Sequence, residues 1–310
     1  MPDAENSPAT SEPAKPAKPA EPSAPPSSVA QFFPGFRHVD LAIDDVTIHA
    51  VIGGSGPPLL VLHGAPESHV MWHGVAAELA AHFTVVAADL RGYGRSSKPP
   101  EGDYSKRRMA RDQVELMAQL GFERFSLLSH DRGSHIGRRM AKDYPGTLEK
   151  LVIMDVVPST YIFENVTRKV AERFWMWFLW SQPAPLPENV MGPQAEGFTR
   201  MVAFGNAEVA DDYALTNGNA AAFHAMCEDY RAGAGIDITH DHADRDVKIT
   251  TPALVLWGSQ SNVAGFDYPA IWKSEIEDVA FAELDCGHFL IVEKPKEVME
   301  QVLPFLLGKS

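Results

Sequence analysis

The sequence predicts an α/β protein in which a mainly parallel, doubly wound sheet is interrupted by an inserted helical cap. Three observations support this prediction. Apolar runs of strand length alternate with helix-like patterns on both sides of residues 159–246, as in a parallel sheet covered by helices. Residues 159–246 break the alternation, because they carry many aromatic residues and no clear buried strand. The stretch "SHDRG" (129–133) places an acidic residue at a sharp break between an apolar run and a helix-like pattern.

The elements of the sheet domain follow in a regular order. "HVDLAI" and "VTIHAVIGG" alternate polar and apolar residues and predict an antiparallel hairpin. Apolar runs that end in turns predict buried parallel strands: "PLLVLHG" (57–64), "TVVAADL", "RFSLLS", "LEKLVIMDVV", "PALVLWG" (252–258) and "VAFAELD". Apolar periodicity and stop signals predict helices in "VMWHGVAAELAAHF" and over residues 106–120, 132–143 and 294–307.

We expect the chain to have three parts. Residues 1–30 are rich in Pro and Ala and cannot bury apolar surface, so they predict a disordered tail. Residues 31–158 and 247–310 form the α/β core, and residues 159–246 form the helical cap. The cap is favoured over a long loop because "FWMWFLW" is too apolar for an exposed segment.

The composition limits the partners of the protein. The chain has 310 residues and a formal net charge of −14, which argues against nucleic acid, because nucleic acid needs a basic surface. No apolar run reaches the roughly 18–20 residues that cross a bilayer, and the N-terminus has no apolar signal core, so we expect a cytoplasmic protein without a membrane partner. Cys227 and Cys286 are expected to be reduced, although a disulfide is an alternative. Both a monomer and a homodimer fit the sequence.

Asp131 is the main candidate for chemistry. "SHDRG" fits the pattern small–x–nucleophile–x–small, with Ser129 and Gly133 as the small residues. Ligands of open α/β sheets bind beyond the carboxyl ends of the strands, and Asp131 lies at such an end. The alternative is that Asp131 only caps the helix that follows.

A carboxylate at this position indicates a particular reaction. A serine that attacks a saturated carbon forms an ether, which water does not readily cleave. An aspartate that attacks the same carbon forms an ester, which water can cleave. Asp131 therefore predicts displacement at an sp³ carbon, in a carbon–halogen bond or an epoxide, through a covalent intermediate.

Hydrolysis of such an ester needs a base and an acid that orients the base. His288, in "ELDCGHFLIVEKP", lies between the last strand and the last helix, where this chain order places the base. Asp155, after the strand "KLVIMD", is the favoured acid. Asp267 is the alternative, and Asp285 is expected to serve a turn.

The oxyanion formed during ester hydrolysis needs backbone N–H donors. "HGAP" (63–66) follows the third strand, and the N–H of Ala65 is expected to join that of Arg132. The alternative is that "HGAP" is an ordinary strand-end turn.

From about residue 31 to the C-terminus the chain resembles the haloacetate dehalogenases of the α/β-hydrolase fold, the fluoroacetate dehalogenase group. The resemblance rests on "LLVLHGAPE", "ADLRGYGRSSKP", "SHDRG", "IMDVVP", "QPAPLPENVMG", "MCEDYRAGAG" and "GHFLIVEKP". "DLRGYGRSSKP" is also shared with epoxide hydrolases, whereas the cap stretches point to this group. The resemblance implies Asp131 as nucleophile, His288 as base and Asp155 as its acid, without a metal or organic cofactor.

The resemblance also implies sites for the substrate carboxylate and the halide. The family binds the carboxylate with two arginines in a "DRGxR" pattern. Arg132 matches the first, but His135 stands at the second, with Arg138 and Arg139 a helical turn further on. Histidine at neutral pH offers neither the forked geometry nor the permanent charge of arginine.

The family binds the departing halide with a His-Trp pair and a Tyr from the cap. Tyr230 matches the Tyr and Trp177 the Trp, while Met176 stands where the His is expected. The alternative is that these three side chains are packing residues of the cap.

We therefore expect a hydrolytic dehalogenase of small haloacids, with chloro and bromo substrates favoured over fluoro ones because Met176 offers no donor. The alternative is an epoxide hydrolase with the same nucleophile, in which Tyr230 and either Tyr161 or Tyr213 protonate the alkoxide. A non-catalytic ligand-binding protein is a third interpretation, disfavoured by the intact set of Asp131, Asp155 and His288.

Overall fold

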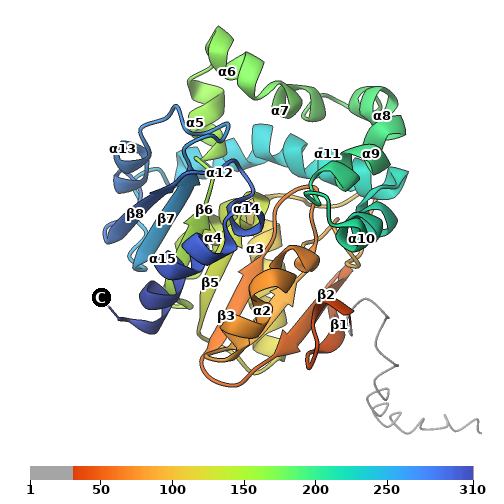
Figure 1. Ribbon diagram of the computed structural model, residues 1–310. Coiled ribbons are helices and arrows are strands. Elements are labelled where there is room, and N and C mark those ends of the chain that lie inside the picture. The colour runs from red at the N-terminus through yellow and green to blue at the C-terminus, as the bar shows by residue number, and fades with distance from the viewer. Residues whose placement is uncertain (1–30, 310) are drawn as a thin grey trace, which may run out of the picture.

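The structure, a computed structural model, describes residues 31–309, so the predicted tail lies outside the described residues. Eight strands form one sheet in the order β1-β2-β4-β3-β5-β6-β7-β8 (Figure 1). β1 and β2 form the predicted antiparallel hairpin, β2 also pairs antiparallel with β4, and the remaining pairs are parallel. The strands are β1 (Arg37–Ile43), β2 (Val46–Gly53), β3 (Pro58–Leu62), β4 (Thr84–Ala88), β5 (Phe125–His130), β6 (Leu148–Met154), β7 (Ala253–Gly258) and β8 (Val279–Leu284).

Helices cover both faces of the sheet, because side chains that alternate along each central strand are buried on opposite sides. Leu60 and Leu62 of β3 belong to one hydrophobic cluster, and Leu59 and Val61 belong to the other. The helices of the core are η1 (His69–Trp72), α2 (His73–Ala80), α3 (Lys106–Gln119), α4 (Arg132–Asp143), α13 (Tyr268–Lys273), α14 (Leu290–Glu293) and α15 (Pro295–Leu307). The predicted doubly wound α/β fold is confirmed.

The chain between β6 and β7 forms a helical insertion. Its helices, green to cyan in Figure 1, lie over one end of the sheet domain. They are α5 (Ser159–Glu164), α6 (Arg168–Arg173), α7 (Trp175–Trp180), α8 (Leu186–Met191), η2 (Gly192–Gln194), α9 (Ala195–Met201), α10 (Ala207–Asn217), α11 (Ala220–Ala234) and α12 (Ile236–Ala243). The strongly apolar α7 contacts α6 and α11, and all of its residues except Trp175 are at least partly buried, as expected for a packed helix rather than an exposed loop.

Two further expectations concern the whole chain. Cys227 and Cys286 are both free and buried, as expected for reduced thiols. Within residues 31–309, no helix combines the length and apolar character needed to cross a membrane.

Candidate active site

Asp131 lies in a sharp turn between β5 and α4. Its backbone has φ of 45°, a left-handed conformation that is costly for a residue with a side chain. The turn fits only because its neighbours are small: a Cβ on Gly133 would come within 2.7 Å of the carbonyl oxygen of His63, and one on Gly64 within 2.6 Å of the Asp131 Cβ. The predicted small–x–nucleophile–x–small pattern therefore has a steric cause.

The carboxylate of Asp131 faces the loop that follows β3. Its Oδ1 accepts a hydrogen bond of 2.9 Å from the backbone N–H of Ala65, and its side chain makes no capping bond to α4. Burial favours the neutral acid, but the charges of His288 and Arg132, together with the Ala65 hydrogen bond, lower the pKa of Asp131. Asp131 is thus a buried anion, and its side chain does not serve as a helix cap.

His288 joins Asp131 to a second buried carboxylate. His288 Nδ1 lies 2.5 Å from Asp155 Oδ2, and His288 Nε2 lies 3.7 Å from Asp131 Oδ2. The other oxygen of Asp155 accepts from the backbone N–H of Gly258 at 2.8 Å, which fixes the carboxylate in place. Burial disfavours the imidazolium, but the hydrogen bond and charge of Asp155, helped by Asp131, raise the pKa of His288 to about 9.

The two alternative acids lie elsewhere. Asp267 accepts a hydrogen bond from the N–H of Ala270 and caps α13. Asp285 accepts from the side chain of Gln260 at 2.7 Å. Asp155 is therefore the carboxylate that contacts the His288 imidazole.

Glu67 and His130 support His288 and were missed in the sequence, although both lie inside quoted motifs. His130 Nε2 lies 2.8 Å from the carbonyl oxygen of His288, and His130 Nδ1 lies 3.2 Å from Glu67 Oε2. Both side chains are fully buried. They hold the backbone of His288, and one oxygen of Glu67 has no hydrogen-bond partner in the described structure.

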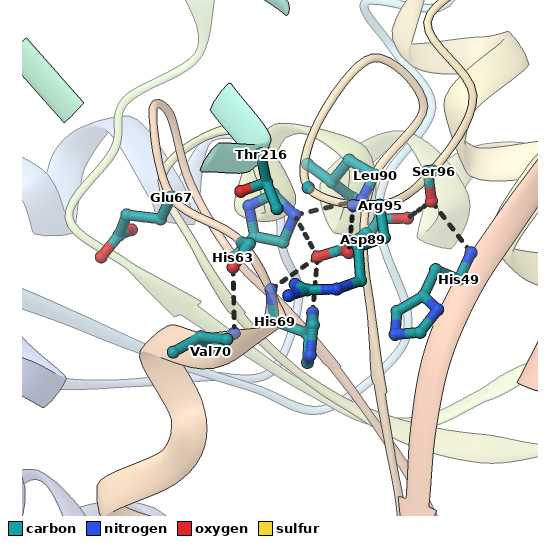
Figure 2. A network of polar contacts seen from close by, with 12 residues as sticks. His49, His63, Glu67, His69, Val70, Asp89, Leu90, Arg95, Ser96 and Thr216 are labelled. Atoms are coloured by element: carbon teal, nitrogen blue, oxygen red, sulfur yellow. Dashed lines mark hydrogen bonds and ion pairs between the residues drawn. The ribbon is translucent and has the colours of Figure 1, made fainter. Parts of the chain in front are cut away.

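A second polar network connects His63, His69 and Asp89 (Figure 2). His63 Nδ1 lies 2.7 Å from the carbonyl oxygen of Gly64, and His63 Nε2 accepts from the N–H of Leu90 at 3.1 Å. The Nδ1–H tautomer of His63 satisfies both contacts, and burial lowers the pKa of His63, so the ring is neutral. The Gly64 carbonyl and the Ala65 N–H belong to the same peptide group, so His63 also fixes the direction of the N–H that reaches Asp131.

The same network contains a group of potential metal ligands. One atom each of His49, His69 and Asp89 lie within 4.8 Å of one another, all buried. Asp89 Oδ1 already accepts from the backbone and side chain of His69, and Asp89 Oδ2 accepts from the backbone N–H of Arg95. We therefore describe this group as a structural network, and Figure 2 shows these contacts converging on Asp89.

A cavity of about 290 Å³ opens beside Asp131 and His288, between the sheet domain and the cap. Ala65, Met176, Trp177 and Tyr230 line it, whereas Arg132 and His135 do not, and the role of all six residues in binding substrate stays a prediction. Most other lining residues are apolar and were not found from the sequence; they include Phe174, Trp180, Phe198, Val202, Phe204 and Phe289. The chamber is larger and more apolar than a two-carbon acid requires.

Arg132 lies behind the cavity wall. Its Nε and Nη2 bind the carboxylate of Asp229, each at 2.8 Å, and its guanidinium lies 4.3 Å from the centre of the Tyr230 ring. Lys106 and the hydroxyl of Tyr93 bind the same carboxylate. Within the described residues no hydrogen bond engages Arg132 Nη1, so that nitrogen remains for a further acceptor.

His135 lies on the far side of Trp177. The two rings meet edge to face with centres 5.8 Å apart, and His135 Nε2 is buried without a hydrogen-bond partner. Burial and the charge of Arg132 lower the pKa of His135 to about 3, so this residue is neutral.

Comparison with known proteins agrees with this geometry. Residues 57–295 match the model of the alpha/beta hydrolase fold family. The chain is 42% identical to a fluoroacetate dehalogenase of Burkholderia sp. over 288 residues, covering 88% of this chain and 95% of that protein. It is 31% identical to a soluble epoxide hydrolase of Corynebacterium sp. (strain C12), covering 86% and 96%.

Solved structures of related proteins have the same fold. A Pseudomonas aeruginosa variant provisionally described as an epoxide hydrolase, with bound MFA, superposes with a TM-score of 0.84 at 40% identity, over 89% of this chain and 97% of that one. The family match, the eight-stranded sheet and its helical insertion all agree with the sequence prediction. The chain belongs to the alpha/beta hydrolase family and is related within it to the fluoroacetate dehalogenases and epoxide hydrolases.

Proposed function

We propose that the protein is a hydrolytic dehalogenase of haloacids that works through an ester of Asp131. The observation that carries this proposal is a buried carboxylate at the strand–helix turn, with an N–H donor at 2.9 Å and the His288–Asp155 pair on its other side. A carboxylate nucleophile suits attack on saturated carbon, and the similarity to a fluoroacetate dehalogenase supports the substrate class.

In the first step, an oxygen of Asp131 attacks the carbon that bears the halogen. The carbon–halogen bond breaks, the halide leaves with the bonding electrons, and Asp131 becomes a neutral ester. No proton moves in this step, so His288 can remain an imidazolium. The lowered pKa of Asp131 ensures that the nucleophile is ionised at neutral pH.

Before the second step, the His288 imidazolium releases its Nε2 proton to solvent. Water then attacks the ester carbonyl of Asp131 while the neutral His288 accepts a proton from that water at Nε2. Loss of the Asp131 charge removes one of the interactions that raise the pKa of His288, so esterification prepares the imidazole to act as a base. The N–H groups of Ala65 and Arg132 stabilise the oxyanion. The carbon–oxygen bond to the ester alkyl group then breaks, and the His288 imidazolium gives its Nε2 proton to the departing oxygen, so that a hydroxy acid is released. The Asp131 carboxyl group loses its proton to solvent, which restores the carboxylate.

Chloro and bromo acids are the proposed substrates, ahead of fluoro acids. Trp177 and Tyr230 line the cavity and offer an indole N–H and a phenol, whereas Met176 offers no donor. Fluoride is the poorest leaving group of the three and depends most on such donors. Arg132 is the proposed anchor for the substrate carboxylate through Nη1, and because Arg132 lies behind the cavity wall, this contact requires a rearrangement of that wall.

An epoxide hydrolase is the second candidate, supported by the Corynebacterium relative. That reaction uses phenols to protonate the alkoxide. Tyr230 is the only tyrosine among the lining residues of the described cavity, because Tyr161 packs on Phe266 and Tyr213 lies outside that lining. The geometry thus favours dehalogenation over epoxide opening.

Halide release from chloroacetate, bromoacetate and fluoroacetate, measured beside the opening of a terminal epoxide, tests the proposal. Halide release that is faster than epoxide opening supports the proposed dehalogenase. Epoxide opening without halide release would refute the proposal. If the protein shows neither activity, the non-catalytic interpretation remains. The cytoplasmic location stays a prediction, which cell fractionation tests. Light scattering decides between the monomer and the homodimer.

A further inference from the structure

A groove of about 270 Å³ lies outside the catalytic cavity, between the core and the cap. Its floor comes from η1, α2 and α14, and its opposite wall comes from α10 and the segment before it. Most of its lining side chains are apolar, among them Met71, Val202, Phe204, Val209, Ile291 and Val292. This groove could not be predicted from the sequence, because its lining residues come from three distant segments, 71–74, 202–213 and 291–295.

The groove and the catalytic cavity share a wall. Val202 and Phe204 line both of them. Phe204 is 51% exposed, and its ring packs edge to face on Phe289 with centres 5.3 Å apart. Phe289 in turn contacts the His288 ring at 4.9 Å. A chain attached to the reacting carbon would therefore meet the side chain of Phe204 on its way from the cavity to the groove.

We propose that this groove, extending past Phe204, binds the saturated hydrocarbon tail of the substrate. The inference rests on the proposed function and names its substrate class: 2-halogenated acids with an unbranched alkyl chain. Three observations favour a hydrocarbon occupant. The groove adjoins the catalytic cavity across Val202 and Phe204, its lining is mainly apolar, and the cavity itself exceeds the needs of a haloacetate.

The proposal predicts how activity depends on chain length. Each methylene that enters an apolar site improves kcat/KM by about fourfold, the factor expected for burial of one CH₂. The assay compares bromide release from bromoacetate with release from 2-bromoalkanoates of increasing length up to 2-bromodecanoate. The measured quantity is the kcat/KM of each long acid divided by that of bromoacetate.

Gly74 offers a variant that fills the groove alone. It lies in α2, lines the groove but not the catalytic cavity, and a Cβ built on it meets nothing within 4 Å. Gly74→Phe should therefore place a ring in the groove, and its Cβ meets no neighbouring atom. Gly197 is the matched control, because it also lies in a helix with open space around its Cβ but lines neither chamber.

In the wild type, we expect the ratio of kcat/KM values to rise with chain length. Relative to the wild type, the ratio for 2-bromodecanoate should fall at least tenfold in Gly74→Phe and should stay unchanged in Gly197→Phe. A flat series with active bromoacetate would overturn the tail site while leaving the proposed function intact. If Gly74→Phe changes the oligomeric state but not the ratio, the groove serves contacts between copies of the chain. That result would also overturn the tail site. If no acid releases halide, the proposed function fails, and calorimetry of decanoate binding to the wild type and Gly74→Phe then decides the tail site.

Discussion

Asp155→Asn is the sharpest perturbation of the proposed mechanism, because it keeps the shape of the side chain and removes its charge. The amide oxygen can still accept from Gly258 N–H, where Asp155 Oδ1 accepts at 2.8 Å. The NH₂ group then faces His288 Nδ1, which must become an acceptor. The imidazole is forced into the tautomer that carries its proton on Nε2, and such a ring cannot accept a proton from water at that nitrogen.

The expected magnitude follows from the pKa of His288. Its rise from 6.5 to about 9 corresponds to about 3.4 kcal/mol in favour of the imidazolium. If Asp155 supplies half of this energy, its loss slows ester hydrolysis roughly 20-fold. The wrong tautomer increases the loss, toward the roughly 10⁴-fold effect known when a triad acid is neutralised. Alkylation of Asp131 needs no proton transfer and should change by less than about tenfold.

Rapid mixing with bromoacetate separates the two steps. We expect Asp155→Asn to release a burst of bromide equal to the enzyme concentration, followed by a slow steady rate. Asp267→Asn is the control, because Asp267 only caps α13, and its kinetics should match the wild type. Equal slowing of the burst and the steady rate by Asp155→Asn, or a larger effect of Asp267→Asn, would refute the assignment of the acid.

Three further predictions concern the same site. His288→Asn should be alkylated by bromoacetate but fail to hydrolyse the ester, and mass spectrometry should find the adduct on Asp131; an adduct on another residue contradicts the mechanism. The pKa of His288 is raised to about 9 mainly by Asp155, so the ion pair of these two residues stabilises the fold fully below about pH 6.5. This stabilisation is lost as pH rises through about 9. The Tm difference between wild type and His288→Gln should therefore shrink between about pH 6 and pH 9.5, and a difference that grows contradicts the pairing. Met176→His adds a donor beside Trp177 and should raise fluoride release relative to chloride release, by up to about 10²-fold; an unchanged ratio shows that this position does not contact the halide.

The strand ends explain why the central residues could be predicted from the sequence. Asp131 and Asp155 directly follow β5 and β6, and His288 follows β8. Parallel strands bring their carboxyl ends to one edge, so three residues far apart in the chain become neighbours once the order of strands is known. The choice of Asp155 over Asp267 depended on the same reasoning.

The contacts of Arg132 and His135 could not be predicted in this way. Arg132 pairs with Asp229, which lies 97 positions further along the chain, and this pair connects the core to the insertion. The order of strands in the sheet does not predict where the helices of the insertion lie. His135 lies one turn beyond Arg132 on α4, yet it faces the back of Trp177, because its direction depends on how α7 packs. The role of both residues in binding the substrate carboxylate stays a prediction.

The carboxylate of Asp229 also makes the two parts of the molecule depend on each other for folding. It belongs to α11, whereas Lys106 and Arg132 belong to the core, and all three side chains are buried. Where Asp229 is lost while both cations stay buried under the insertion, the cost is about 3–5 kcal/mol for a broken buried pair. The core and the cap should therefore unfold in one cooperative transition, and a cap exchanged from a relative must bring its own acidic residue to this position.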